Sequence, residues 1–555
     1  MRKSLSGAWC PAALLVVVFF SGLAPVGAEE NDSVGPTGHA EQTHRVSSRE
    51  APPDQGMSGE GLTAEMLVAG NVGTESMFGT DGTYSEYGLS LHYDSPDSAF
   101  FGSADFRALG DDRYGVSHAF LDSPVYFLIR EAGIGFAGEP LSARAGRFPH
   151  RDVVDSPYAL FVSSREHPAF LYELDYEGEW LRFLTRSVEL SRNSVLDYPD
   201  KSLVFQTVAV TRPNWEFGFQ DATVAVPIRA EQIEDVYAED GDGSGEVVVE
   251  RIRRSDGSGP VFVPELFFSP LPGYLTQYII GAQEPEEGRP WGQEINYKSL
   301  MGFYGVLDGH ARGTPWEVEA QILVDDFNAN AVFNPDDSQN PFMGAWMLSG
   351  LFETDYGRFR LSHAGSLMYT FQTSQDRRYS YTYYPDTKFP RNGRMQTIDY
   401  RDNYFGLYLG ENTLAFRLDW DDQYAAPERL GNNIDLNATV EYTASGSKSP
   451  ANQWGDFDSW RDLEGAGSGT GAFSSTRLLD ESPLEHGLSF SLGAALSRPL
   501  GAGALTLGLT GDFGAWFNVL ERDTADDGGM DLYRPSDSTY VESRVGAFAR
   551  VAFDW

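Results

Sequence analysis

The last eleven residues, VGAFARVAFDW, restrict the possible fold more than any other stretch of the chain. Every second side chain from Val545 to Trp555 is apolar, whereas Arg550 and Asp554 lie between them and Arg544 comes one residue earlier. Strict period two is typical of a β-strand with two unlike faces. The sequence therefore predicts a C-terminal strand with one apolar face and one charged face.

The beginning of the chain has the pattern of a secretory signal peptide. Two basic residues precede the apolar run Ala12–Phe20, and small residues follow it up to Ala28. This order is typical of a cleaved signal, and the run is shorter than the roughly 20 residues that span a bilayer. We predict a signal peptide at residues 1–28 and a disordered periplasmic lead-in at residues 29–60, which has few large apolar side chains. Cys10, the only cysteine, would leave with the signal.

Residues 61–555 consist of short alternating segments separated by turn residues. Leu488, Phe490 and Leu492 share one face, and a short break and a second alternating segment follow before a long polar stretch. Short turns that alternate with long loops are typical of outer-membrane barrels. A soluble β-sandwich would show the same alternation with its apolar face buried. The signal peptide, the long strands and the terminal aromatic residue favour an all-β fold, a transmembrane antiparallel β-barrel of about 18 strands (roughly 16–20).

Charge and motif content exclude several classes of function. The formal net charge of -40 excludes free-solution binding to nucleic acid, because phosphate contacts need a basic surface. The chain has no nucleophile elbow, zinc-protease motif or phosphate-binding loop. The acidic run Glu239–Glu246 is similar to a weak calcium site, but the tip of an exposed hairpin is the simpler interpretation. We expect no cofactor and no metal. We expect no enzymatic activity; a barrel enzyme is the alternative, for which His363 near Ser362 and Ser366 is the candidate group.

Charged side chains on the predicted lumen side are the candidate ligand residues. In TLAFRLDWDD the arginine and aspartates alternate with apolar residues, which places the charges inside the barrel. Arginine–carboxylate pairs that neutralise the lumen are one interpretation, and a ladder that guides an anionic sugar or another anion is the alternative. The candidates are Arg182, Arg186, Asp325, Arg358, Arg360, Arg417, Arg544 and Arg550.

Two stretches resemble outer-membrane proteins of the Wzi type, the capsule-assembly barrels that hold polysaccharide at the cell surface. One is AQILVDDFNAN (Ala320–Asn330), in which a strand ends in Asp-Asp-Phe. The other is the segment Ala143–Phe170, in which a Gly-Arg strand end precedes a proline-broken stretch. The resemblance implies an 18-stranded barrel with an occluded lumen and a lectin-like role. No polysaccharide-contacting residue of that family matches a position in this chain.

Residues 149–167 and Glu265–Gln283 are the candidates for a plug. Neither has a period-two pattern, and both are too apolar for ordinary exposed loops. We therefore expect a plugged outer-membrane barrel that binds or organises surface polysaccharide, with a porin or substrate-selective channel as the alternative. The expected partners are outer-membrane lipids and lipopolysaccharide, a surface polysaccharide, and the outer-membrane assembly machinery, whose sorting signal the terminal aromatic residue resembles.

Overall fold

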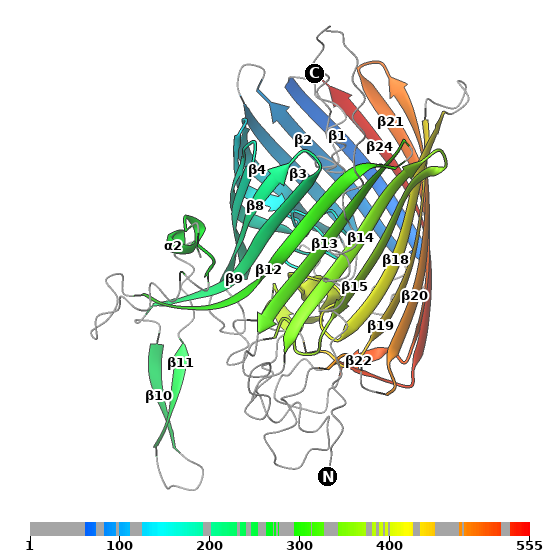
Figure 1. Ribbon diagram of the computed structural model, residues 1–555. Helices are drawn as coiled ribbons and strands as arrows, with labels where there is room; N and C mark the ends of the chain where they lie inside the picture. The colour runs from blue at the N-terminus through cyan, green and yellow to red at the C-terminus, as the bar shows by residue number, and fades with distance from the viewer. Residues whose placement is uncertain are drawn as a thin grey trace, which may run out of the picture. The chain divides into compact units, whose positions relative to one another are not determined.

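The computed structural model describes most of the chain between residues 61 and 554 (Figure 1). The predicted signal peptide, the lead-in at residues 29–60 and residues 240–245 of the acidic run lie outside the described residues. The described ranges are 61–73, 83–95, 99–110, 125–191, 201–229, 233–239, 246–252, 262–269, 271–273, 276, 293–311, 313–326, 342–372, 380–383, 388–391, 394–397, 400–425, 433–449, 477–479, 482–522 and 533–554.

The chain forms a closed antiparallel barrel of 18 strands, which confirms the predicted fold class. Each strand pairs with the next barrel strand along the chain, and the last strand pairs with the first, with Thr63 opposite Asp554. The barrel strands are β1 (Gly61–Gly73), β2 (Thr83–Asp94), β3 (Phe100–Gly110), β4 (Val125–Ala137), β5 (Leu141–Pro149), β6 (Pro168–Glu177), β7 (Leu181–Ser191), β8 (Lys201–Arg212), β9 (Trp215–Arg229), β12 (Gln293–Ala311), β13 (Thr314–Asp326), β14 (Met343–Thr354), β15 (Gly357–Ser366), β18 (Thr413–Ala425), β19 (Asn433–Ser445), β20 (Glu485–Leu500), β21 (Gly503–Phe517) and β24 (Thr539–Asp554).

The two faces of each strand have the chemistry that the alternation predicts. Large apolar side chains are exposed on the outer face, for example Ile134, Leu509 and Val545. Residues between them, such as Arg417 and Asp512, face the lumen, where they make charged and polar contacts. An exposed apolar exterior around a polar interior suits a barrel whose outer solvent is lipid.

The connections between strands are short at one end of the barrel and mostly long at the other. The short end carries the turns 213–214, 312–313, 355–356 and 501–502, and both the start of β1 and the end of β24 lie there. The opposite end carries the connections 150–167, 230–292, 367–412 and 446–484. This is the asymmetry of outer-membrane barrels, whose short turns face the periplasm.

Among the described residues, three small sheets and two short helices accompany the barrel. The acidic run lies between β10 (Ile233–Glu239) and β11 (Glu246–Ile252), which pair as the predicted hairpin. The other elements are β16 (Lys388–Arg391) with β17 (Arg394–Thr397), β22 (Leu520–Arg522) with β23 (Tyr533–Pro535), α2 (Pro264–Phe267) and α5 (Tyr400–Asn403). No helix among the described residues is long and apolar enough to cross a membrane.

Two long connections fold back into the barrel and fill part of its lumen. We call residues 150–167 the first interior segment and residues 367–372, 380–383 and 400–412 the second interior segment. Leu160 N donates to Gln321 Oε1 of β13 (2.8 Å), and the Tyr381 hydroxyl donates to Phe161 O (2.6 Å). The buried aromatic and aliphatic side chains of both segments form one core with the inner wall. The prediction of a plug at 149–167 is therefore confirmed.

Two of the few lysines hold the interior segments in place. Lys201 Nζ of β8 donates to Ser380 O (3.1 Å), and Lys448 Nζ donates to Glu411 O (2.6 Å). Both lysines are fully buried. Because a buried ammonium group is costly without hydrogen-bond partners, these contacts fix the connections at defined points of the wall.

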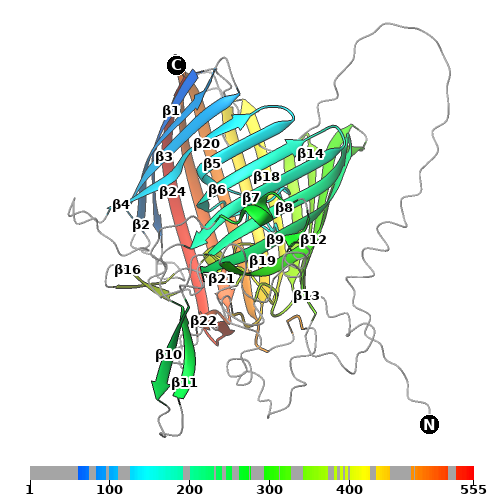
Figure 2. The ribbon, with the colours of Figure 1, turned by 90° about the vertical axis from the view of Figure 1, so that its left-hand side faces the viewer.

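The second predicted plug, residues 265–283, is wrong in its placement. The described residues of this stretch contact Thr185, Gln206 and Asp221, which point to the outer face of β7, β8 and β9. Figure 1 draws α2 outside the wall, and Figure 2, seen from that side, shows the helix in front of β7 and β8. The stretch covers the barrel instead of filling it, because the wall at this level is polar on its outer face.

Candidate functional site

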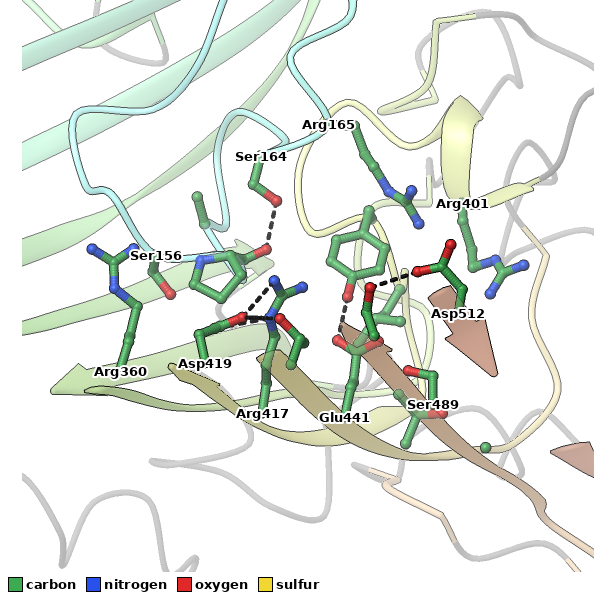
Figure 3. A pocket seen from close by; sticks show the side chains of 18 of the residues that line it. Ser156, Ser164, Arg165, Arg360, Arg401, Arg417, Asp419, Glu441, Ser489 and Asp512 are labelled. Carbon is green, nitrogen blue, oxygen red and sulfur yellow. Dashed lines mark hydrogen bonds and ion pairs between the residues drawn. The ribbon is translucent and has the colours of Figure 1, made fainter. Parts of the chain in front are cut away.

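A cavity of about 740 Å³ remains in the lumen beside the interior segments. Its walls are the first interior segment, α5 with the residues that follow it, and the inner faces of β15, β18–β21 and β24 (Figure 3). Ten carboxylates, seven arginines and seven serines or threonines line it. The cavity is therefore a polar site with many donors and acceptors, bounded on one side by a packed core.

The strand side of the cavity carries a row of charged residues in hydrogen-bonded pairs. Arg417 of β18 donates from Nε to both carboxylate oxygens of Asp419 (2.9 Å each), and Thr439 of β19 donates to the same carboxylate (2.7 Å). On β15, Arg358 pairs with Asp421 (3.2 Å). Alternation along neighbouring strands places these side chains on one face, where they present a fixed pattern of charge to the cavity.

The interior side of the cavity is fixed to the same wall by a second ion pair. Arg360 Nη2 of β15 lies 2.5 Å from Asp155 Oδ2 in the first interior segment. Asp155 N donates to Glu319 Oε1 of β13 (2.7 Å). Asp152 accepts hydrogen bonds from Phe161 N and Val162 N (3.1 Å each), and burial raises its pKa. These contacts hold the segment as a rigid boundary of the site.

Two tyrosines from the interior segments converge on one carboxylate of the wall. The hydroxyls of Tyr158 and Tyr408 donate to Glu441 Oε1 of β19, at 2.8 Å and 2.5 Å, and the two rings are stacked. Burial, followed by the nearby Glu441 carboxylate, raises the pKa of both phenols. The phenols therefore stay protonated donors to the wall, and of the two rings only that of Tyr408 lines the cavity.

Two arginines of the cavity have no carboxylate partner among the described residues. The Arg165 guanidinium lies over the Tyr408 ring, 4.5 Å from its centroid. Arg544 of β24 lines the cavity and makes no hydrogen bond or ion pair with the part of the chain that the structure describes. Figure 3 shows Arg165 reaching the cavity from the interior segment, opposite the strand that carries Glu441. These groups are positioned to bind an anionic part of a ligand.

The predicted candidates divide into two groups. Four of them, Arg358, Arg360, Arg417 and Arg544, line the cavity. The other four lie elsewhere on the inner wall and bind partners of their own: Arg182 with Asp175 and Glu216, Arg186 with Glu173, Asp325 with Lys298, and Arg550 with Glu65.

The alternative of a barrel enzyme depended on His363 and Ser362, which do not meet. His363 stacks on Phe416, which is exposed on the outer face, whereas Ser362 is buried and shares a hydrogen bond with Ser349. Successive residues of a strand point to opposite faces, so adjacency in sequence separates these side chains. Among the described residues, no group of three or more histidine, cysteine or acidic side chains is placed to hold a metal ion.

The site residues that the sequence analysis missed come from the connections. Tyr158, Arg165 and Tyr408 lie in segments without a regular period, so no alternation marks the face to which each side chain points. The proline-broken, apolar character of 149–167 was the only available signal, and it indicated burial without indicating which side chains reach the cavity.

The fold, the polar lumen and the exposed apolar exterior define the chain as an outer-membrane β-barrel. No protein-family model and no curated protein sequence matches it. Among solved structures it is similar to Wzi of Escherichia coli, which is described as an outer-membrane protein involved in group 1 capsule assembly and as a carbohydrate-binding β-barrel. The two chains are 10% identical, the match covers 88% of this chain and 84% of that chain, and the TM-score is 0.43. It is also similar to Pseudomonas aeruginosa OccD3 (10% identity, 90% and 92% covered, TM-score 0.40) and OprD (10%, 89% and 96%, TM-score 0.41).

Proposed function

We propose that the lumenal cavity binds a sugar chain that carries carboxylate groups, and that the plugged barrel holds this ligand at the cell surface. The observation that carries the proposal is that Arg165 and Arg544 line the cavity without a carboxylate partner among the described residues, beside paired charges and hydroxyl groups. Paired carboxylates, arginines and hydroxyls suit the many hydroxyls of a sugar, and unpaired guanidinium groups suit its carboxylates.

The aromatic residues of the cavity support the same ligand class. Tyr400, Tyr408 and Trp516 line it, and the phenol of Tyr408 is fixed by Glu441. A rigid aromatic ring offers an apolar face at low entropic cost, next to polar groups that fix orientation. The sugar ring, which has an apolar face and a polar edge, matches this arrangement.

The test is a matched pair of arginine variants on one strand. Arg544 and Arg550 share the inner face of β24, but Arg544 lines the cavity whereas Arg550 pairs with Glu65 outside it. Binding of an oligogalacturonate to the refolded protein is measured by calorimetry, with maltohexaose as the neutral sugar. We expect Arg544→Gln to weaken oligogalacturonate binding by about tenfold or more, since a hydrogen bond to a charged group contributes roughly 1.5–3 kcal/mol.

Arg550→Gln should bind like the parent protein. Equal affinities for the two sugars, or equal losses in the two variants, would contradict the proposal. If both variants bind oligogalacturonate with the affinity and stoichiometry of the parent protein, the ligand lies elsewhere on the barrel.

A second candidate function, a narrow substrate-selective channel, rests on how far the cavity extends along the wall. It reaches from Arg358, which lies just after the short turn 355–356, to Glu485, the first residue of β20 at the end with the long connections. A channel of this kind would give small steps of conductance that the bound sugar blocks. Planar-bilayer recordings separate the candidates, because a holding site gives a silent protein that still binds the sugar.

A further inference from the structure

The outer face of the barrel carries a strip of polar side chains where lipid contact would require apolar ones. Thr185, Gln206 and Asp221 are direct neighbours across β7, β8 and β9, and Thr223 lies two residues further along β9. We call these four residues the polar strip. Val208, Val210 and Phe217 continue the same face toward the short turns and are exposed, so the apolar band of the exterior stops at the strip.

All four residues of the polar strip are buried, although they point away from the lumen. The cover is the strap, as we name residues 262–276, of which 262–269, 271–273 and 276 are described. Val263 and Leu266 of the strap pack on Val204 and Ala225 of the outer wall. A carboxylate or amide facing hydrocarbon costs several kcal/mol, so the strip is compatible with lipid only beneath such a cover.

The strip in turn satisfies the backbone of the strap. Gln206 Nε2 donates to Leu266 O and to Ser269 O (2.8 Å each), and the Thr185 hydroxyl donates to Phe267 O (2.9 Å). Asp221 Oδ2 accepts from Gly273 N (3.0 Å) and from the Thr223 hydroxyl (2.8 Å). A loop in water needs no such partners, because water satisfies its free carbonyls. In a nonaqueous medium, by contrast, the free backbone groups of a turn or a helix end need hydrogen bonds from protein side chains.

The opposite face of the strap is apolar and exposed. Phe268 is 68% exposed and Leu271 is 41% exposed, and Phe262 packs edge to face against Tyr172 of the neighbouring strand β6. Figure 2 shows the helix of the strap lying in front of the strands on this side. The large apolar side chains of the strap point outward, whereas its backbone groups bond to the polar strip on the inner side. The strap therefore continues the lipid-facing apolar band over the polar strip.

We propose that the strap is embedded in the membrane and binds the acyl chains of the leaflet nearest the long connections. The connection between β9 and β12 thus supplies a second, lipid-facing layer over a sector of the wall that is itself unfit for lipid. Gln206 is the residue that holds the strap, since its amide serves two carbonyl groups.

The experiment uses single cysteines introduced into a protein in which Cys10, the only cysteine of the printed sequence, is replaced by serine. A nitroxide at Phe268→Cys is compared with one at Val545→Cys on the lipid face of β24 and one at Tyr356→Cys in a short turn, which is 79% exposed. The proteins are reconstituted in phosphatidylcholine vesicles, and folding is checked by heat-modifiable migration in electrophoresis. Collision rates with oxygen, which concentrates in the bilayer, and with a water-soluble nickel chelate are measured for each label.

We expect the label at position 268 to match position 545, with oxygen collisions dominant, and to differ from position 356. A water-like ratio at position 268 would overturn the proposal, and so would shielding from both reagents, which indicates that a second copy of the chain covers the strap. Adding Gln206→Leu should move the label at 268 several-fold toward the aqueous ratio, whereas Gln423→Leu, at an exposed site near the short turns, should leave it unchanged. An unchanged ratio in the Gln206→Leu protein would overturn the role given to its amide.

Discussion

The first interior segment and the strap have similar sequences and opposite locations. Both are apolar, both contain prolines, and both lack the period of a strand or a long helix. The first lies inside the barrel, where Gln321 and Glu319 of β13 satisfy its backbone, and the second lies outside, where Gln206 and Asp221 do the same. The comparison indicates that an apolar connection lies on the face of the wall that offers hydrogen-bond partners to its backbone.

Replacing each segment in turn by a glycine–serine linker should separate their roles most strongly. We expect the protein with residues 153–161 replaced to open the lumen, since the packed core of the plug is lost, and to give large conductance steps in planar bilayers. Replacement of residues 264–271 should leave the conductance at the parent level and should lower the yield of inserted protein, because the polar strip then faces lipid. Equal conductance in the two proteins would contradict the assignment of inside and outside.

Single phenylalanine truncations should sharpen the comparison. Phe161 is fully buried in the interior core, and Phe267 of the strap is 6% exposed. Phe161→Ala should lower the free energy of unfolding by about 3–5 kcal/mol, as for other core aromatic residues. Phe267→Ala should cost only about 1 kcal/mol, because acyl chains can replace the lost contacts without exposing the site to water. Urea titrations in lipid vesicles measure both, with Phe268→Ala as a near-neutral control.

The pH dependence of stability should contain a contribution from His150 of the first interior segment. His150 is buried there, 3.0 Å from the Tyr383 hydroxyl, and burial, followed by the positive charge of Arg186, lowers its pKa well below 6.5. The unfolded chain therefore binds this proton more readily than the folded chain. Below pH 6.5 the stability should fall by up to about 1.4 kcal/mol per pH unit, until the lowered pKa is reached.

His150→Asn should reduce this slope by the contribution of His150, and urea titrations between pH 5 and about 7 measure the change. Tyr383→Phe removes the hydrogen bond but retains the histidine, so it should lower the stability at every pH while the slope persists. If the pH dependence of stability is unchanged in the His150→Asn protein, another titratable group causes it.

The sequence predicted the wall of the barrel well because every strand residue has only two directions to point. Alternation placed Arg358, Arg360 and Arg417 on the inner face, and the structure brings all three to the cavity. The same rule could not choose partners, because Arg417 binds Asp419 on its own strand whereas Arg360 reaches Asp155 in a distant connection. Those contacts depend on how the connections fold, which no period records.

The seam between β1 and β24 sets an order of assembly. Thr63 pairs with Asp554, so the barrel can close only when its last strand is in place beside its first. Before closure both edge strands offer unpaired backbone groups, which are prone to pair with other chains. The first interior segment binds β9, β13, β15 and β19 through Gln220, Gln321, Arg360 and Glu441. These contacts join one short connection to four strands that lie far apart in the sequence.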